Sequence, residues 1–188
     1  MSNGLLKFFE MAAKLKTLRR AGWHRCGVSP CESVAEHTFG VAILALLLPG
    51  SAGLSVDRNR CVAMALVHDL AESIVGDLTP HDPVTAEEKQ RREQAAIDEL
   101  AKTLGDESAR SELVELWEEF AAAQTPEAQL VRDLDVIEMA WQACAYRESG
   151  RLSAPAAEKF LESSRNRIRT EAGRALLQQI TRDSPPIA

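Results

Sequence analysis

The chain has 188 residues, of which 45% are hydrophobic and 5% aromatic, and this composition suits one domain with a core of aliphatic side chains. A formal net charge of −6 and a pI near 5.3 argue against a protein that tracks a nucleic-acid polymer, because that activity needs a basic surface. The longest apolar stretch, residues 41–48, is far shorter than the ~20 residues that a membrane span requires.

The N-terminus and the cysteines point to the cytoplasm. The first ten residues lack the basic segment and the continuous apolar run of a signal peptide. The four cysteines, Cys26, Cys31, Cys61 and Cys144, contain no CxxC pair and lack the dense spacing of a disulfide scaffold. Only His24 lies near Cys26 and Cys31, so packing is a better interpretation than a zinc site. We expect a cytoplasmic protein with reduced thiols and no membrane contact.

Apolar residues at helical spacing predict an all-α protein. The first helix is expected to bury one face, made of Leu5, Leu6, Phe8, Phe9, Ala12, Leu15 and Leu18. Ser2 or Asn3 is available as its N-cap, and a loop is expected at Gly22. A second helix should begin at a capping box of Ser33 and Glu36 and continue to residues 49–50, which places His37 in its first or second turn.

A third helix, residues 58–68, follows Asp57 as its N-cap. Its nearly continuous apolar character predicts burial on most sides and brings His68 and Asp69 to the interior. Residues 74–83 contain Gly76, Pro80 and Pro83 and should form a loop.

The second half of the chain continues as helices. Thr85 and Glu88 form another possible capping box, followed by a charged helix to about Leu104 whose residues 89–93 suit a solvated, ion-paired surface. Further helices are expected at about 108–123, 127–148 and 154–181, and the tail from Asp183 should fray. Residues 1–182 thus form one domain, a helical bundle, with residues 183–188 outside it.

His68 and Asp69, adjacent at the end of an apolar run, suggest two metal ligands. A catalytic divalent cation needs about three or four nitrogen or oxygen ligands, and His37 and Asp135 are the best further candidates. Each lies in an apolar helical pattern, where an unpartnered polar group costs about 1–3 kcal/mol. Asp133 competes with Asp135, but residues two apart on a helix point to nearly opposite sides, and Asp135 shares its face with apolar neighbours.

The order of these four residues on helices resembles the HD-domain metal-dependent phosphohydrolases. Several segments are similar to the family's 5'-nucleotidases that act on deoxyribonucleoside monophosphates: residues 22–23, 32–37, 68–77, 89–93 and 134–139. Together the motifs cover about residues 15–146, in the order found in the family. The resemblance therefore implies a single compact HD-domain helical bundle, with its C-terminal helices at about 154–181.

The resemblance also implies a site. His37, His68, Asp69 and Asp135 would hold one divalent metal cation, and their nitrogen and oxygen donors suit Mn, Co, Fe, Ni or Zn better than an all-oxygen Mg site. Glu72 lies one helical turn after His68 and matches the glutamate that positions or activates water.

Substrate contacts come from the resemblance as well. Asp77 matches an aspartate that contacts the deoxyribose 3'-hydroxyl, and Trp23 matches a tryptophan packed near the sugar. The alternatives are that Asp77 belongs to an ordinary turn after Gly76 and that Trp23 belongs to the core, but the resemblance favours the substrate contacts. The family often has arginine immediately before this tryptophan, where the chain has Gly22, so phosphate binding falls to a nearby arginine, with Arg20 preferred over Arg19 and Arg25.

These residues predict a metal-dependent 5'-nucleotidase that converts deoxyribonucleoside 5'-monophosphates, a small-molecule substrate, to nucleoside and phosphate. The family suggests a homodimer. One alternative is an HD phosphohydrolase acting on a triphosphate, cyclic or alarmone nucleotide, which the short chain disfavours. The other is a non-catalytic nucleotide-binding helical module, which the complete set of polar site residues disfavours.

Overall fold

The computed structural model describes residues 3–52 and 54–183. In these ranges the regular structure is helical, apart from one isolated bridge between Arg19 and Ser33, so the all-α prediction is confirmed. The elements are α1 (Asn3–Ala12), the 3₁₀ helix η1 (Ala13–Lys16), α2 (Ala21–Arg25), α3 (Val34–Ser51), α4 (Arg58–Val67), α5 (Glu72–Val75), α6 (Ala86–Thr103), α7 (Glu107–Ala122), α8 (Pro126–Glu148), α9 (Ala154–Arg167) and α10 (Glu171–Asp183).

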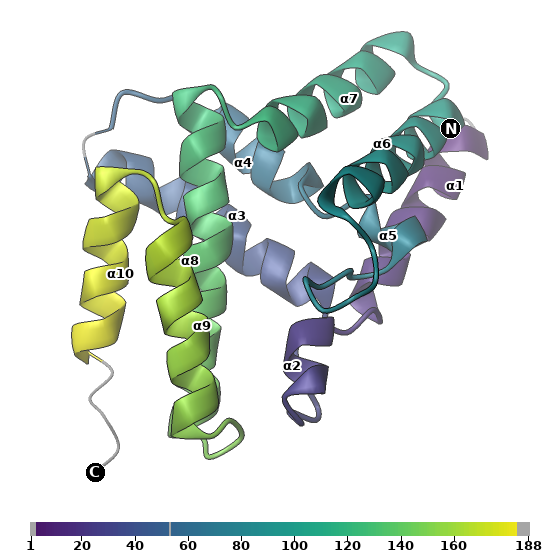
Figure 1. Ribbon diagram of the computed structural model, residues 1–188. Helices are drawn as coiled ribbons and strands as arrows, with labels where there is room; N and C mark the ends of the chain where they lie inside the picture. Colours follow the sequence, from purple (N-terminus) through teal and green to yellow (C-terminus); the bar gives the residue numbers. More distant parts are fainter. Residues whose placement is uncertain (1–2, 53, 184–188) are drawn as a thin grey trace.

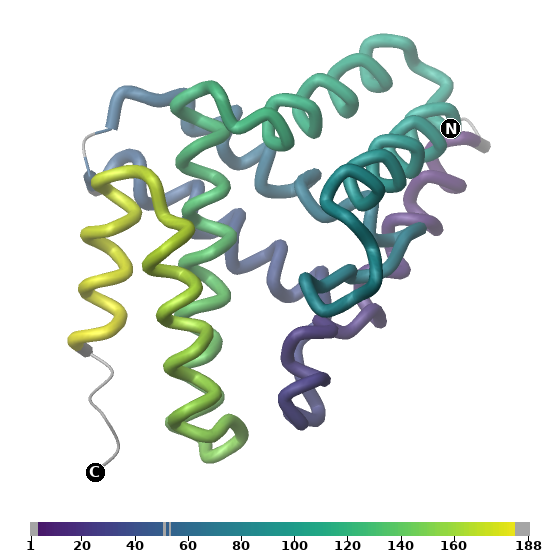
Figure 2. Tube along the Cα trace, in the orientation of Figure 1, coloured from purple at the N-terminus to yellow at the C-terminus, as the bar shows by residue number. Residues whose placement is uncertain are grey.

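Helix α8 is the central element of the bundle. It packs against α3, α4, α7, α9 and α10, and Figure 1 shows α9 and α10 running alongside it. Its apolar residues, including Leu130, Leu134 and Ile137, are buried in the main core with residues of α3 and α4. A second cluster lies under α6 and α7, which cover α1 and α5 at the other end of the molecule (Figure 2). The candidate site residues on α3, α4 and α8 therefore come from the most tightly packed helices.

Side-chain caps start several helices where the sequence predicts them. Ser33 and Glu36 form the complete capping box of α3, with Ser33 Oγ accepting from Glu36 N at 3.2 Å and Glu36 Oε2 accepting from Ser33 N at 2.6 Å. Asp57 accepts from two backbone N–H groups of α4. Thr85 Oγ1 accepts from Glu88 N at 3.2 Å and caps α6, but the Glu88 carboxylate pairs with Arg91 and Arg92 and does not complete the predicted capping box. These caps fix the positions at which α3 and α4 begin, and so the depth at which His37 and His68 lie.

The C-terminal range 154–181, expected to be helical, consists of two helices. The chain breaks after α9, and α10 begins at Glu171. Buried Asp133 on α8 accepts hydrogen bonds from the backbone N–H groups of Arg169 and Thr170, and the Thr170 hydroxyl accepts from Gly173 N. Because Asp133 binds these amides, they cannot enter a continuous helix ladder, and the chain turns back.

The N-terminal segment differs from the prediction. Leu5, Leu6 and Phe9, expected in the buried face, are more than half exposed, whereas the partly buried Phe8 packs against the second cluster. The buried stripe is narrower than the apolar pattern suggested, because α1 packs against α6 and α5 and is not covered on its other side. Asn3 lies within α1, and Ser2 and the tail residues 184–188 lie outside the described residues.

Two smaller expectations were also wrong. The loop predicted at Gly22 is instead the short helix α2. Arg20, which comes just before this helix, has an extended backbone. In α4, Leu66 is 53% exposed, because α4 packs against α3, α7 and α8 but is not enclosed on every side.

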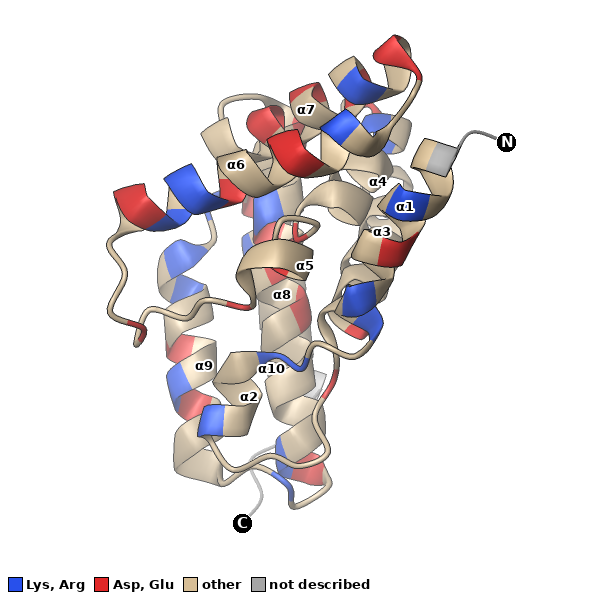
Figure 3. Cartoon of the chain, turned by 90° about the vertical axis from the view of Figure 1, so that its right-hand side faces the viewer, with Lys and Arg blue, Asp and Glu red and all other residues tan. Residues whose placement is uncertain are grey.

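The charged face of α6 is an ion-paired surface, as predicted. Lys89 pairs with Glu93 at 2.7 Å, and Glu88 pairs with both Arg91 and Arg92. Figure 3 shows these alternating charges along α6, above the basic residues of α9. Within the described residues, every helix is too short or too polar to cross a membrane, and all four cysteines are free thiols.

Candidate active site

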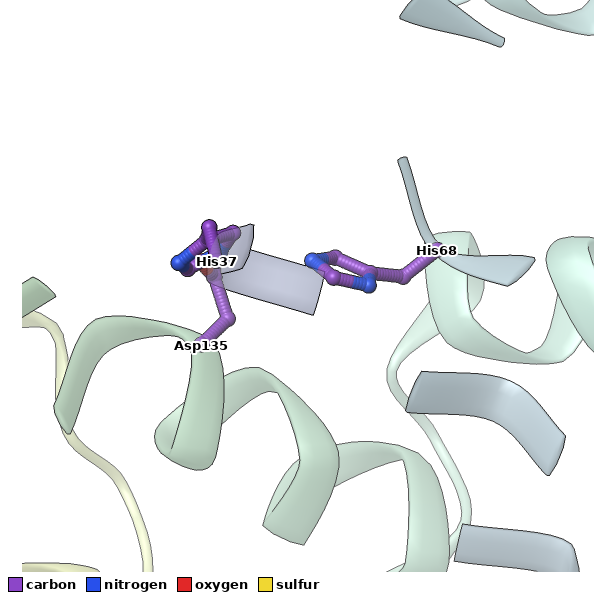
Figure 4. A group of neighbouring side chains, drawn as sticks. All are labelled: His37, His68 and Asp135. Atoms are coloured by element: carbon purple, nitrogen blue, oxygen red, sulfur yellow. The ribbon is translucent and has the colours of Figure 1, made fainter. Parts of the chain in front are cut away.

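The four predicted ligand residues lie together although they come from three helices. His37 is on α3, His68 is the C-cap of α4 with Asp69 after it, and Asp135 is on α8. Figure 4 shows His37, His68 and Asp135. His37 Nε2 is 3.2 Å from Asp135 Oδ1 and 3.8 Å from Asp69 Oδ2, and His68 Nε2 is 3.2 Å from Asp69 Oδ2. The donor atoms of His37, His68 and Asp135 all lie within 4.8 Å of one another.

Both imidazoles are oriented so that Nε2 faces this space. His37 Nδ1 is 2.5 Å from Glu138 Oε2, and His68 Nδ1 is 2.7 Å from the carbonyl oxygen of Ala65. Each contact favours a proton on Nδ1 and leaves the Nε2 lone pair free. Both Nε2 atoms are buried, and neither has a hydrogen-bond partner within the part of the chain that the structure describes. Two buried nitrogen donors next to two carboxylates fit a divalent cation of the transition series.

The electrostatics agree with that fit. Burial lowers the pKa of His37, as does Arg20, but the adjacent carboxylates of Asp135 and Glu138 outweigh them and raise it to about 9. Burial raises the pKa of Asp69 and Asp135, yet the nearby histidines and Arg20 hold both well below the usual range. The two carboxylates therefore stay anionic, and their charge favours a cation at this position.

Glu72 is the first residue of α5 and is 5% exposed. Its Oε2 atom is buried without a hydrogen-bond partner. Burial, followed by the charges of Asp69 and Asp77, raises its pKa well above the usual range for glutamate. The structure thus places an unpartnered carboxyl oxygen within the electrostatic reach of the predicted ligands, where it could accept a hydrogen bond from a water molecule.

Arg20 lies at the edge of this cluster. Its Nη1 atom is 3.5 Å from Asp69 Oδ2 and 3.9 Å from Asp77 Oδ1. Burial lowers the pKa of Arg20, but these two carboxylates outweigh burial and raise it, so the guanidinium stays charged. Asp77 also accepts a 2.6 Å hydrogen bond from Ala21 N, which ties the loop after α5 to the start of α2.

The two other arginine candidates point elsewhere. Arg19 donates to the carbonyl oxygen of Cys31 and contacts Glu36, and Arg25 pairs with Asp82. Of the three arginines that the sequence offered, Arg20 is the one that the structure brings to the candidate ligands.

Trp23 lies in the core. The residue is 2% exposed, and its ring packs against those of Tyr146 and Phe160, with centroid distances of 5.3 and 4.3 Å. Its indole Nε1 donates to Glu32 Oε1 at 2.7 Å. A ring enclosed to this extent has a structural role, and its contact with a sugar stays a prediction.

Asp133 and Asp135 have separate roles. Asp135 faces the histidines, whereas Asp133, 2% exposed, binds the connection between α9 and α10. Since the two residues point to opposite sides of α8, the alternative ligand Asp133 is too far round the helix to join the cluster.

Glu138, which was not among the predicted site residues, is buried against His37. It follows Asp135 by three residues on α8, so the two carboxylates share one face of the helix. Gly40, three residues after His37, makes room for it, because a Cβ atom there would lie 2.8 Å from Glu138 Cγ. The sequence signal for Glu138 was its position: it is a charged residue one helical turn after Asp135, in an otherwise apolar stretch.

Sequence comparison places this arrangement in a known family. The family model described as "HD domain" matches residues 12–176, which is most of the chain. The protein belongs to the HD domain family.

Relatives of this HD domain protein align over nearly its whole length. The 5'-deoxynucleotidase HDDC2 of Dictyostelium discoideum is 39% identical over 190 residues, which are 97% of this chain and 99% of that protein. The human 5'-deoxynucleotidase HDDC2 is 40% identical over 147 residues, 78% of this chain and 70% of that protein. A crystal structure of a Pyrococcus horikoshii protein superposes with a TM-score of 0.78 at 30% identity, covering 94% of this chain and 98% of that one.

Glu138→Gln in this HD domain protein is expected to weaken divalent-metal binding about 10- to 100-fold, the usual cost of losing a hydrogen-bonding partner behind a ligating histidine. The amide no longer favours the proton on His37 Nδ1 by its charge, so Nε2 becomes a poorer donor. Competition with a chelator of known affinity measures the change. Glu148→Gln, which neutralises an exposed glutamate at the end of the same helix, is the matched control. Equal metal affinity in the two variants would contradict a role for Glu138.

Proposed function

We propose that this HD domain protein is a metal-dependent 5'-deoxynucleotidase, a phosphoric monoester hydrolase that converts deoxyribonucleoside 5'-monophosphates to nucleoside and phosphate. The observation that carries the proposal is the pair of buried imidazoles whose unpartnered Nε2 atoms converge beside two anionic carboxylates. The relatives named 5'-deoxynucleotidase, about 40% identical to this chain, support the same reaction.

The proposed metal ligands are His37, His68, Asp69 and Asp135. A divalent cation at this position would lower the pKa of a water molecule and act as a Lewis acid on a phosphoryl oxygen. Mn, Co, Fe, Ni, Zn and Mg all stay candidates, since nitrogen and oxygen donors alone do not select one.

The chain's own residues supply the remaining steps. The Glu72 carboxylate orients a water molecule toward phosphorus and accepts its proton as the new P–O bond forms. The bond from phosphorus to the 5'-oxygen breaks, and the proton passes to that leaving oxygen to give the nucleoside. The Arg20 guanidinium, held by Asp69 and Asp77, offers positive charge to the phosphate. Asp77 is proposed to accept a hydrogen bond from the 3'-hydroxyl.

A panel of nucleotides tests the activity. Phosphate release from deoxy- and ribonucleoside monophosphates should disappear after chelation and return when a divalent metal is added back. Nucleoside triphosphates and cyclic nucleotides belong in the same panel, because preferred hydrolysis of one of these would favour a different HD phosphohydrolase. No release from any nucleotide with any metal would support a non-catalytic module.

Deoxyribonucleoside 5'-monophosphates should be hydrolysed about tenfold to a hundredfold better than ribonucleotides, with little base preference. A 2'-hydroxyl that loses water without gaining a partner costs about 1–3 kcal/mol. Comparing kcat/KM for dAMP and AMP measures the gap, and equal values would defeat the argument.

Trp23 is the residue predicted to enforce this difference. Trp23→Ala should narrow the gap, but loss of a buried indole also costs about 3–5 kcal/mol of stability. Trp23→Phe preserves most of the core volume and is the better variant, with the melting temperature recorded beside the rates. An unchanged sugar preference in a folded Trp23→Phe protein would limit this tryptophan to the core.

We also propose a homodimer, formed through the face between α3, α8 and α10. A groove of about 860 Å³ lies there, and its walls include Phe39 and Trp141, which are 68 and 54% exposed. Arg151 and Glu36 lie at the same groove, so its charges can pair with those of a second copy. Light scattering should give the mass of a dimer, and Trp141→Ser should shift it toward the monomer. A monomeric unmodified protein would contradict this proposal.

The four free thiols support a cytoplasmic location.

A further inference from the structure

Two arginines outside the predicted site residues lie beside the candidate metal centre. Arg132 is on α8, one turn before Asp135, and Arg167 is the last residue of α9. Neither belongs to a motif that carried the family resemblance. Figure 3 shows basic residues on α9 below the charged face of α6.

Arg167 reaches a candidate ligand directly. Its Nη2 atom is 3.7 Å from Asp135 Oδ2, while Asp135 Oδ1 is the oxygen that lies 3.2 Å from His37 Nε2. The Arg167 side chain is 53% exposed, so much of its guanidinium faces solvent and not the protein. The Asp135 carboxylate therefore lies between the candidate metal position and the Arg167 guanidinium, which has further N–H donors available.

Arg132 has no carboxylate partner among the described residues. Its guanidinium lies 5.1 Å from the ring centroid of Phe120, and that ring is 5.3 Å from the ring of His68. Burial lowers the pKa of Arg132, and the positive charges of Arg167 and Arg169 lower it further against the opposing effect of Asp135. Positive charge is therefore concentrated next to the metal centre and only partly compensated.

A bound anion would neutralise the positive charge of Arg132 and Arg167. A phosphate monoester carries close to two negative charges at neutral pH and offers several acceptor oxygens, which guanidinium groups match in charge and in geometry. Arg20 also offers positive charge to such a group, but Asp69 and Asp77 balance much of it, so further guanidinium groups are needed to match the charge of a phosphate monoester.

We propose that Arg132 and Arg167 form a phosphate-binding subsite that holds the phosphoryl group of the substrate, and of the phosphate product, against the metal centre. The inference rests on the proposed function for the identity of the substrate, but not for the binding of phosphate itself. A purely structural interpretation, in which Arg167 only orients Asp135, makes a different prediction, namely a loss of metal affinity.

The probe is inorganic phosphate, because its binding needs no turnover. Calorimetric titration of the Mn²⁺-loaded protein should give a phosphate affinity that Arg132→Met and Arg167→Met each weaken about 10- to 100-fold. Arg165→Met is the matched control. It removes one positive charge from α9, as Arg167→Met does, but native Arg165 pairs with Glu158 and not with a candidate ligand. It should leave phosphate affinity unchanged. Arg132→Lys, which keeps the charge, should recover part of the affinity and so separate charge from packing.

Metal affinity, measured by chelator competition, should stay within about twofold in both methionine variants, and KM for dAMP should rise in parallel with the phosphate dissociation constant. Undetectable phosphate binding by the unmodified protein, or unchanged affinity in both variants, would overturn the proposal. The proposal would also be overturned if Arg167→Met lost as much affinity for the metal as for phosphate. If phosphate binding depends on both arginines but no nucleotide is hydrolysed, the subsite stands and the proposed function fails. If nucleotides are hydrolysed but phosphate binding does not depend on the two arginines, the proposed function stands and the subsite fails.

Discussion

His68→Ala is expected to lose the bound divalent metal and the phosphatase turnover together. The residue is 4% exposed, its Nδ1 lies against Ala65 O, and its Nε2 has no hydrogen-bond partner among the described residues. Removing it leaves too few ligands to hold the ion in a site that must also keep a position open for water. Asp69→Ala should give the same result. Elemental analysis of the purified variants and phosphate release from dAMP are the two measurements.

The control for this loss is His24→Ala, which removes an exposed histidine of α2. This variant should keep its metal and its rate. Stoichiometric metal with normal turnover in His68→Ala or Asp69→Ala would show that the pair does not hold the ion. Circular dichroism of each variant separates loss of the metal from loss of the fold.

Glu72→Ala should behave differently by keeping the metal while losing turnover about 10²- to 10⁴-fold. Positioning of water and general-base catalysis contribute on this order without holding the ion. The buried, unpartnered Oε2 atom of Glu72 is the structural reason to expect this role. Rates measured at saturating metal, together with metal content, separate the two effects.

Glu118→Gln on the exposed face of α7 serves as the control for Glu72. Unchanged turnover in a metal-replete Glu72→Ala protein would remove this glutamate from the mechanism. Loss of metal would instead make Glu72 a ligand, so the two measurements assign its role in either case.

The local features of the chain were readable from the sequence. The capping box at Ser33 and Glu36, and the caps at Asp57 and Thr85, depend on residues only two to four positions apart, and the structure contains each of these caps. Helical periodicity was sufficient for the all-α class. Polar residues within apolar helices marked His37 and Asp135 as candidates, because burying them without partners is costly.

The errors arose where distant residues decide the outcome. The break between α9 and α10 depends on Asp133, which lies 36 and 37 residues before the amides that it binds at Arg169 and Thr170. The expected helical range, 154–181, therefore did not locate this break. The short helix α2 likewise begins where Asp77, from a loop 56 residues later, accepts from Ala21 N.

The sequence by itself determined the helices, most of their starting points and the residue types available for a metal site, because caps and periodicity are local properties of the chain. Only the tertiary structure decided how those residues meet. It set Asp135 and not Asp133 beside His37, and it buried Glu138 against the same imidazole from 101 residues away. It also brought Arg167 of α9 to Asp135. Such contacts depend on which faces of α3, α8 and α9 pack together, and many side chains throughout the core determine that packing jointly.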